Sequence, residues 1–301
     1  MWLVVLIDWT IRDSVSSLAF VFYATPPVVL GLMAFLLAWI GLQPKGTRSA
    51  PIPLLVNRTT AILGAICLIQ WAAVSFRLGA SSERSPETLK VVFWNIGRGQ
   101  FASWERIAEQ ARAFDADVLA FAEATDDRVQ TPEFWETTIP GYSSHPLNGS
   151  MVVLVRGKAI ERTVGLLKRM GRYCHLSLEV RGTQFDLLIA DLESNPFRSR
   201  EQPLKELFNL MRGQTVPTLV VGDFNTPPAS IWFDDWRPEY KHAWETAGHG
   251  YQATWPQPLP VLALDHVWGN GGIAFQHCRC GWTRCSDHRP VIVDLTVKAR
   301  D

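Results

Sequence analysis

The feature that most constrains this chain is the division of its 301 residues into an apolar first part and a remainder of ordinary soluble composition. From Ser14 to Pro44 the only ionisable side chain is Tyr23, and the segment Leu18–Leu42 is long enough to cross a hydrocarbon layer as a helix. A second charge-free stretch, Thr59–Phe76, lies at the short end of that range. The pattern predicts two transmembrane helices.

Two other interpretations of these segments are a buried core helix and a cleaved signal peptide. A signal peptide has one short apolar region and a small-residue cleavage site, whereas here two long apolar segments are joined by a polar loop. The pattern therefore favours a retained helical hairpin. Pro26 and Pro27 are predicted to kink its first helix.

The connecting loop indicates the orientation of the hairpin. It runs from Gln43 to Arg58, carries Lys45 and Arg48, and contains no acidic residue. Basic loops are retained in the cytoplasm, so two crossings place everything after Arg77 outside it, on the far side of the inner membrane. We therefore expect a membrane anchor over residues 1–80, a polar linker over 81–88 and a folded domain over 89–301.

The folded part is predicted to be one α/β domain, because short apolar runs bounded by turn residues alternate with stretches of helical period. Helical spacing occurs over Phe101–Phe114 and Leu204–Met211. The predicted strands are Val91–Trp94, Val118–Phe121, Met151–Val155, Phe185–Ala190, Leu219–Val221, Val261–Trp268 and Val291–Leu295.

Charge and cysteine content narrow the function. The 29 basic and 29 acidic residues balance, which argues against a tight nonspecific binder of duplex nucleic acid. Cys278, Cys280 and Cys285 cluster near the end of the chain, where an external location permits a disulfide whose pairing the spacing does not define. With His277 they also form a candidate zinc site, although the spacing matches no common pattern.

Polar side chains stand at the ends of the apolar runs, where strands would deliver them to one rim. They are Asn95, Glu123, Asp191, Asp223, Asn225, Asp265, His266, Asp287 and His288. Any one of them could be an ordinary turn or core residue. Together, carboxylates and amides without thiolate suit a hard cation such as Mg²⁺ or Mn²⁺, and these ions commonly act on phosphate.

Two motifs in this set carry a resemblance. Gly222-Asp223-Phe224-Asn225 and Ser286-Asp287-His288-Arg289-Pro290-Val291 are similar to the signatures of the endonuclease/exonuclease/phosphatase superfamily. Its Asn strand, Glu strand and Leu-Asp-His element match Asn95, Glu123 and Leu264-Asp265-His266, in the family's order. Thr254-Trp255-Pro256 resembles a bacterial membrane-anchored subgroup.

The resemblance implies a four-layer α/β sandwich, two packed mixed β-sheets flanked by helices, following the N-terminal transmembrane hairpin. It also implies a metal site, with Glu123 as the main ligand of Mg²⁺ or Mn²⁺ and Asn95 and Asp287 close to the same ion. The expected activity is a metal-dependent phosphodiesterase, with nucleic acid or phospholipid as substrate, the membrane as a partner and no protein partner.

The resemblance assigns catalytic roles to four further residues. Asp223 would orient or deprotonate the attacking water, and Asn225 would hold that water or a phosphate oxygen. His288 would donate to the phosphoryl oxygens, while Asp265 fixes its tautomer and raises its pKa.

One position departs from the family. Many members have a histidine where this chain has Asp191. Asp191 would either bind a second cation or weaken the site, and nearby Glu193, Asn195, Arg198 or Arg200 would then reach the phosphate instead. The departure leaves open a noncatalytic, membrane-tethered binding domain that retains the fold.

Overall fold

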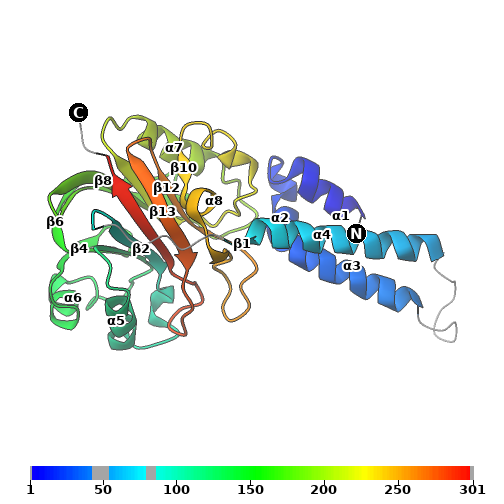
Figure 1. The fold of residues 1–301 in the computed structure, drawn as a ribbon, viewed down its shortest axis with the longest axis horizontal. Coiled ribbons are helices and arrows are strands. Elements are labelled where there is room, and N and C mark those ends of the chain that lie inside the picture. Colours follow the sequence, from blue (N-terminus) through cyan, green and yellow to red (C-terminus); the bar gives the residue numbers. More distant parts are fainter. Residues whose placement is uncertain (1, 43–53, 79–85, 299–301) are drawn as a thin grey trace. The chain divides into compact units, whose positions relative to one another are not determined.

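The computed structural model describes residues 2–42, 54–78 and 86–298 (Figure 1). It contains two compact units, one formed by residues up to Arg77 with Pro196–Ser199 and the other by Leu78–Asn195 with Arg200 onwards. Lys45 and Arg48, which underlie the predicted orientation, and most of the linker 81–88 lie outside the described residues. Arg58 belongs to a helix rather than to the predicted loop.

The first unit consists mainly of apolar helices. They are α1 (Trp2–Leu6), the π-helix η1 (Ile7–Ile11), α2 (Ser16–Ala24), α3 (Pro27–Leu42) and α4 (Leu54–Ser75), followed by the short strand β1 (Phe76–Arg77). The kink predicted at the proline pair is confirmed, because α2 and α3 meet there at 72°. Among the helices that the structure describes, α4 is the one that is long and apolar enough to cross a membrane. The bent pair α2 and α3 would add a second span if the two helices form one span together.

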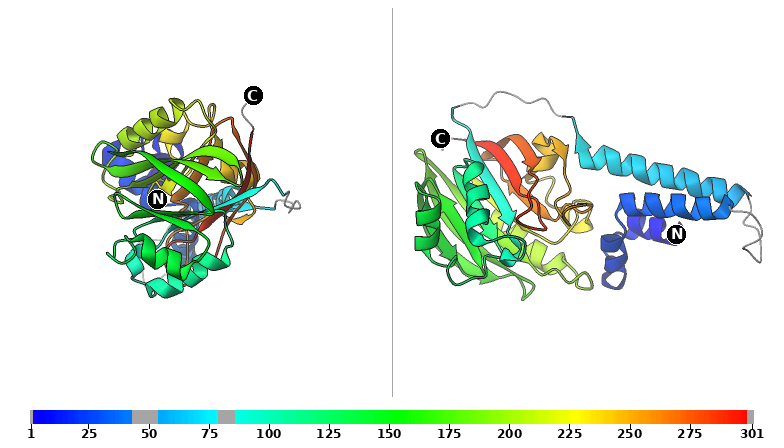
Figure 2. Two further views of the ribbon diagram at one scale, coloured as in Figure 1. Left: turned by 90° about the vertical axis from the view of Figure 1, so that its left-hand side faces the viewer. Right: turned by 90° about the horizontal axis from the view of Figure 1, so that it is seen from below.

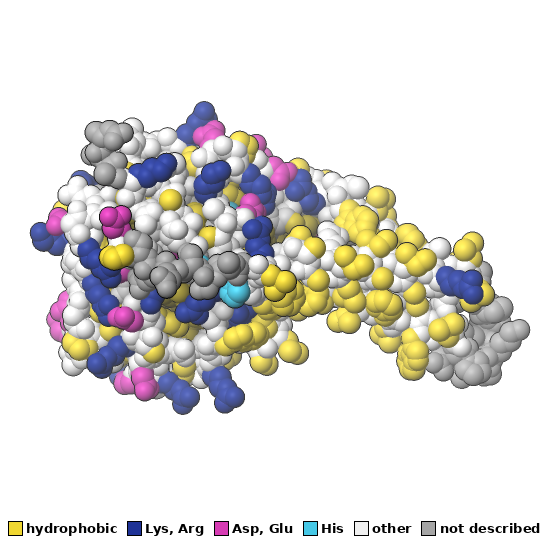
Figure 3. Space-filling view, viewed as in Figure 1, with side chains coloured by type: hydrophobic (Ala, Val, Ile, Leu, Met, Phe, Trp, Pro, Cys, Tyr) yellow, Lys and Arg dark blue, Asp and Glu magenta, His cyan; other side chains and the backbone are white. Residues whose placement is uncertain are grey.

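Small residues let α3 and α4 approach closely. A Cβ atom on Gly64 would lie 2.9 Å from the Cβ of Ala34 and 3.1 Å from the carbonyl oxygen of Gly31, so only glycine fits there. The remaining faces of these helices expose large apolar side chains such as Leu36 and Ile69, and Figure 3 shows hydrophobic groups spread over them.

Two six-stranded mixed sheets form the second unit, and this confirms the predicted two-sheet α/β architecture. One sheet has the order β10-β12-β9-β8-β7-β6 and the other β13-β14-β2-β3-β5-β4. Parallel pairing joins β2 to β3 and β8 to β9, whereas the other neighbours are antiparallel. The twelve strands are β2 (Leu89–Asn95), β3 (Val118–Ala122), β4 (Ser143–Leu147), β5 (Met151–Val155), β6 (Gly157–Leu166), β7 (Gly171–Val180), β8 (Thr183–Leu192), β9 (Thr218–Asp223), β10 (Lys241–His242), β12 (Asp265–Gly269), β13 (Ile273–Cys280) and β14 (Val291–Val297). The short strand β11 (Gly250–Tyr251) belongs to neither sheet.

Helices cover the outer face of each sheet (Figures 1 and 2). Helices α5 (Trp104–Ala113) and α6 (Pro132–Thr138) pack on the β2-β3-β5 side through a cluster that includes Trp94 and Trp135. Helix α7 (Glu201–Arg212) covers the β8-β9 side. The remaining helical elements are η3 (Gly97–Gly99), η4 (Ile231–Phe233) and α8 (Ala243–Ala247).

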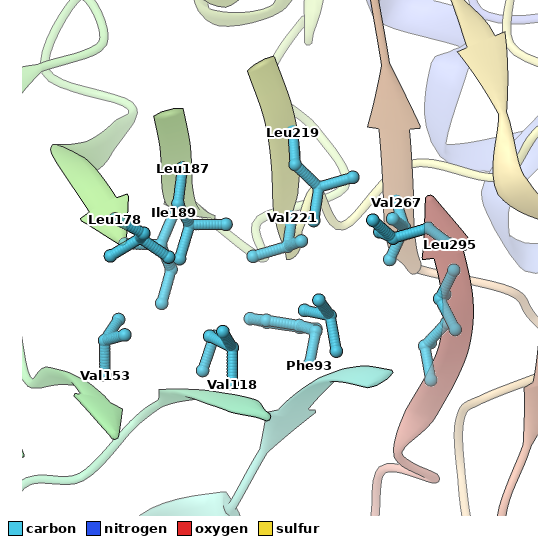
Figure 4. Packing of buried hydrophobic residues seen from close by; sticks show 14 of the residues in the cluster. Phe93, Val118, Val153, Leu178, Leu187, Ile189, Leu219, Val221, Val267 and Leu295 are labelled. Atoms are coloured by element: carbon cyan, nitrogen blue, oxygen red, sulfur yellow. The ribbon is translucent and has the colours of Figure 1, made fainter. Parts of the chain in front are cut away.

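The central core lies between the two sheets, where alternate side chains of each strand meet (Figure 4). On β2 these are Leu89, Val91 and Phe93, and on β9 they are Leu219 and Val221. Period-two burial follows from the pleat of a strand, in which successive side chains point to opposite faces. The next inward position on each strand is therefore at the mouth of the inter-sheet space.

Several sequence predictions need correction. Strands β4, β6, β7 and β13 were not expected, and the predicted strand Val261–Trp268 begins only at Asp265. Helix α5 begins at Trp104, so Phe101 lies before it and is half exposed.

The possible disulfide among the last three cysteines is not formed in this structure, in which all five cysteines are free. Cys278 faces the inter-sheet core, whereas Cys285 packs in the cluster on the outer side of the same sheet. A disulfide between Cys278 and Cys285 would have to cross the sheet. His277 lies 3.8 Å from Asp294, and among the described residues His277 and these cysteines do not form a cluster with metal-ligand geometry.

Candidate active site

The polar residues at the strand ends lie at one mouth of the inter-sheet core. In the β8-β9-β12 part of the sheet, Asp191 is the register partner of Asp223, and Asp223 is the register partner of Asp265. Register partners share a face of a sheet, so three carboxylates stand side by side. Each continues the inward-facing apolar positions of its strand, for example Leu219, Val221 and then Asp223.

Asn95 joins the two sheets at this mouth. Its Nδ2 donates to Oδ2 of Asp223 over 3.0 Å, and its backbone oxygen accepts from Oγ of Ser286 over 2.8 Å. Both contacts are buried. Asn95 therefore fixes the carboxylate of Asp223 relative to the Ser286-Asp287-His288 segment that precedes β14.

His288 completes the group between Asp265 and Asp223. Its Nδ1 lies 2.9 Å from Oδ2 of Asp265, and its Nε2 lies 3.8 Å from Oδ2 of Asp223. Burial by itself lowers the pKa of His288, but the charges of Asp265 and Asp223 outweigh it and raise this pKa to about 10. The imidazole is therefore cationic at neutral pH, as predicted.

Burial and neighbouring carboxylates also raise the pKa values of Asp223 and Asp191. Burial and the charge of Asp265 raise the pKa of Asp223 to about 7. Burial, together with Asp223 and Glu123, raises the pKa of Asp191 well above its usual range. A bound cation would lower both values, because it favours the charged carboxylates.

Asn225 is held in a left-handed backbone conformation, φ +48°, directly after β9. Its backbone N–H donates to Oδ1 of Asp223 over 2.9 Å, and its Nδ2 donates to the carbonyl of Leu192 over 2.8 Å. Buried Arg200 donates to the carbonyls of Asn225 and Asn195. Arg200 thus supports the loop, and the suggestion that it reaches the phosphate is not supported.

Glu123, Asn95 and Asp287 carry the oxygens that sequence analysis assigned to a metal. Asn95 and the residue before Glu123 are register partners on parallel strands, so the two side chains leave adjacent strand ends. Gly97 has φ +58°, its backbone N–H donates to Oδ1 of Asn95 over 3.0 Å, and a Cβ there would be 3.0 Å from Oδ1 of Asp287. Gly97 thus adjoins the side-chain oxygens of Asn95 and Asp287, and the two carboxylates and the amide are donors that fit a hard cation.

A second arrangement also has ligand-type geometry. Asp223, Asp265 and His288 offer three atoms within 4.8 Å of one another, the one such group of His, Cys, Asp and Glu among the described residues. This trio was predicted as catalytic, not as metal-binding. A protonated imidazole is not a ligand, and His288 already uses Nδ1 on Asp265, so the oxygen set fits a hard ion better.

A cavity of about 490 Å³ opens beside these groups. Glu123, Asp191 and Asn225 belong to its lining, so three of the predicted site residues share this cavity. The lining does not include the other predicted residues, Asn95, Asp223, Asp265, Asp287 and His288. Arg98 also lines it and holds Glu123 through two contacts of 3.1 and 3.3 Å. The guanidinium of Arg98 therefore lies beside Glu123, the predicted main metal ligand.

Arg98 was not predicted, and neither were two other supporting residues. Trp255 donates from Nε1 to Oδ2 of Asp287 over 3.1 Å, and the hydroxyl of Thr254 accepts from the backbone N–H of Leu264. Thr254 and Trp255 belong to the Thr-Trp-Pro element, so the motif was visible although its contacts were not. Arg98 had a weaker signal, its position three residues after Asn95.

Comparison with known proteins agrees with this architecture. A sequence model of the Endonuclease/Exonuclease/phosphatase family matches residues 92–288, more than half of the chain. A search of curated protein sequences gave no match.

Solved structures resemble the second unit. An endonuclease/exonuclease/phosphatase family protein from Bacteroides thetaiotaomicron is 16% identical with a TM-score of 0.56, covering 72% of this chain and 100% of that one. The human Nocturnin catalytic domain with a bound sulfate anion is 18% identical with a TM-score of 0.51, covering 72% and 97%. A mannosyl-6-phosphatase, also from Bacteroides thetaiotaomicron, is 15% identical with a TM-score of 0.53, covering 69% and 99%. At these identities the likeness concerns the fold.

Proposed function

Because the chain belongs to the endonuclease/exonuclease/phosphatase family, we propose that it is a divalent-metal-dependent phosphodiesterase anchored in a membrane. The observation that carries the proposal is the buried hydrogen-bonded group formed by Asn95, Asp223, Asp265 and His288. Such a group combines a proton acceptor with a cationic donor, which phosphoester hydrolysis requires.

In this mechanism Asp223 accepts the proton of the attacking water, and its pKa of about 7 suits a general base near neutral pH. Asn95 fixes the orientation of its carboxylate. His288 donates from Nε2 to the phosphoryl oxygens as their charge increases, while Asp265 holds Nδ1. Asn225 positions Asp223 through its backbone N–H and presents its side-chain oxygen to the water.

Glu123, Asn95 and Asp287 would hold Mg²⁺ or Mn²⁺, which when bound neutralises the phosphate charge. Asp191, in place of the family histidine, lies on the cavity wall with Glu123. We assign it to a second cation because its carboxylate adds negative charge to a site that must accept an anion.

A phospholipid is the second candidate substrate, favoured by exposed apolar residues beside the site. Phe101 is 50% exposed and lies 3.2 Å from the position that a Cβ of Gly97 would take. Leu259 is 79% exposed in the loop whose Gln257 N–H donates to the carbonyl of Asp287. The exposed apolar faces of α3 and α4 support the anchor, and the basic segment between them supports an extracytoplasmic domain.

The test is hydrolysis of bis(p-nitrophenyl) phosphate by the full-length protein in detergent, with Mg²⁺, Mn²⁺ or a chelator. We expect metal-dependent release of nitrophenol and a loss of at least about 100-fold in His288→Ala. Metal binding without turnover would instead support the noncatalytic binding domain. Oligonucleotides and phospholipid vesicles then separate the two substrate classes, and a reporter enzyme fused to the C-terminus tests the orientation.

A further inference from the structure

Two arginines on the far wall of the active-site cavity have no role in the mechanism above. Arg169 and Arg172 line the 490 Å³ cavity together with Asp191 and Glu123. Neither forms a salt bridge with an acidic group in the part of the chain that the structure describes. Two free guanidinium groups in a cavity that must admit a phosphoester indicate an anionic ligand.

The sheet register places Arg172 in line with the catalytic carboxylates. Arg172 on β7 is the register partner of Asp191 on β8, which is itself the partner of Asp223 on β9. All three continue the inward-facing positions of their strands, as Cys174 and Leu176 show for β7. Two strand spacings, about 10 Å, separate the backbones of Arg172 and Asp223.

Arg172 is directed away from its carboxylate neighbour. Its Cδ lies 2.7 Å from the position that a Cβ of Gly149 would take, and Gly149 has φ +85° in the turn between β4 and β5. The arginine stem therefore crosses from one sheet towards the turn of the other, over a residue that must lack a side chain. This close approach explains why it forms no ion pair with Asp191.

Arg169 is presented by a well-fixed hairpin turn between β6 and β7. The backbone N–H of Leu167 donates to the carbonyl of Gly171, and Met170 donates back to Leu167. The N–H of Glu193, just after β8, donates to the carbonyl of Met170 over 2.8 Å. The turn is thus tied to the strand that carries Asp191, which keeps Arg169 on the cavity wall.

From this placement we propose that Arg169 and Arg172 bind a second phosphate group of the substrate, next to the one that is hydrolysed. The inference rests on the proposed function and deepens it: the substrate is a phosphodiester that carries a further phosphate. A nucleotide chain supplies this group through its adjacent phosphate, and a lipid supplies it through a phosphorylated headgroup.

Matched substrates test the inference on the full-length protein in detergent. One pair is the p-nitrophenyl ester of thymidine 5′-phosphate with a free or a phosphorylated 3′-hydroxyl, and the other is phosphatidylinositol without or with one headgroup phosphate. We expect KM to be about tenfold lower for the phosphorylated member of one pair, the size of a charge-assisted contact. The pair with the larger difference identifies the source of the phosphate.

The double variant R169Q/R172Q should bring the KM ratio of that pair close to one. Arg162→Gln is the control, because Arg162 is an exposed arginine on the same hairpin that donates to Ser177 and does not line this cavity. The control should keep both the ratio and the turnover. Absence of a KM difference in both pairs, or a difference that survives in R169Q/R172Q, would overturn the inference while the phosphodiesterase proposal stands.

If the protein hydrolyses none of these compounds, the proposed function fails and the inference is decided by binding. Calorimetric titration with inorganic pyrophosphate should then show binding that R169Q/R172Q weakens about tenfold and Arg162→Gln does not. No binding, or equal binding by all three proteins, would refute the second-phosphate site.

Discussion

Nδ1 of His288 lies 2.9 Å from Oδ2 of Asp265, and this buried contact determines which nitrogen of the imidazole faces Asp223. With Nδ1 held by Asp265, Nε2 is directed to the mouth of the inter-sheet core, 3.8 Å from Oδ2 of Asp223. Nδ1 therefore makes the contact that positions the ring, and Nε2 is the nitrogen that faces the substrate side. The charge of Asp265 also raises the pKa values of both Asp223 and His288, and these two values define the pH range of activity.

Asp265→Asn should shift both limbs of the pH profile to lower pH. The active form has Asp223 ionised and His288 protonated, so the rate rises as Asp223 ionises and falls as His288 loses its proton. The two pKa values are about 7 and about 10 without a metal ion, and a bound cation moves both limbs to lower pH. Asp265 raises both pKa values by its charge, so its neutralisation lowers both. We also expect kcat to fall about 100-fold, measured as initial rates from pH 5 to 11.

Asp186→Asn is the matched control for that experiment. Asp186 and His175 form a similar pair, 2.8 Å apart on β7 and β8, that plays no part in the mechanism. The pH–rate profile of Asp186→Asn should match that of the wild type. A profile of Asp265→Asn that kept both limbs in place would contradict the assigned roles.

Asp223→Asn removes the proposed base while keeping its shape. The side chain can still accept from Nδ2 of Asn95, so the fold should persist. We expect kcat to fall about 1000-fold and the rising limb that reports ionisation of Asp223 to disappear, because the amide of the variant does not titrate. The measurement is the single-turnover rate of the variant at saturating Mn²⁺. A reduced rate with the Mn²⁺ affinity of the wild type would confirm the assignment, whereas the wild-type rate would exclude Asp223 as the base.

Metal affinity distinguishes the two possible ligand sets. Glu123→Gln should weaken Mn²⁺ binding at least about tenfold, because a carboxylate ligand becomes a neutral amide. Asp265→Asn should change it by less than about threefold if the ion lies with Asn95, Glu123 and Asp287. Calorimetry or electron paramagnetic resonance of Mn²⁺ measures both variants. The reverse order of effects would place the ion at Asp223, Asp265 and His288.

Much of the site was predictable because strands alternate their side chains regularly. Once Leu219 and Val221 face inward, Asp223 must follow them, and the same holds for Phe93 and Asn95 on β2. Period-two burial therefore brings strand ends that are distant in sequence to one rim. What the sequence lacked was the register between strands, which places Asp191 beside Asp223.

The missed elements had weak or mixed signals. Strand β6 is almost wholly exposed, so it has no apolar run to detect. Strand β7 does alternate, with Cys174, Leu176 and Leu178 buried, and this alternation is itself a strand signal. It was missed because the predicted strands were largely continuous apolar runs, and β7 contains none. Arg172 was overlooked with that strand. By contrast, Val261–Trp268 was predicted too long because apolar residues before Asp265 pack in a loop rather than a ladder.

Gly222 is the residue of the Gly-Asp-Phe-Asn motif whose role is steric. A Cβ there would lie 2.1 Å from the carbonyl oxygen of Ala190 and 2.7 Å from the ring of Phe224. Strands β8 and β9 would have to separate, so Gly222→Ala should lower the free energy of unfolding by about 3 kcal/mol. The melting temperature should fall by about 6 to 10 °C.

In Gly213→Ala, the control, the new Cβ would meet nothing closer than 3.6 Å, and stability should stay within about 0.5 kcal/mol. Equal melting temperatures for both variants would show that the strands adjust, and the glycine would then need another explanation.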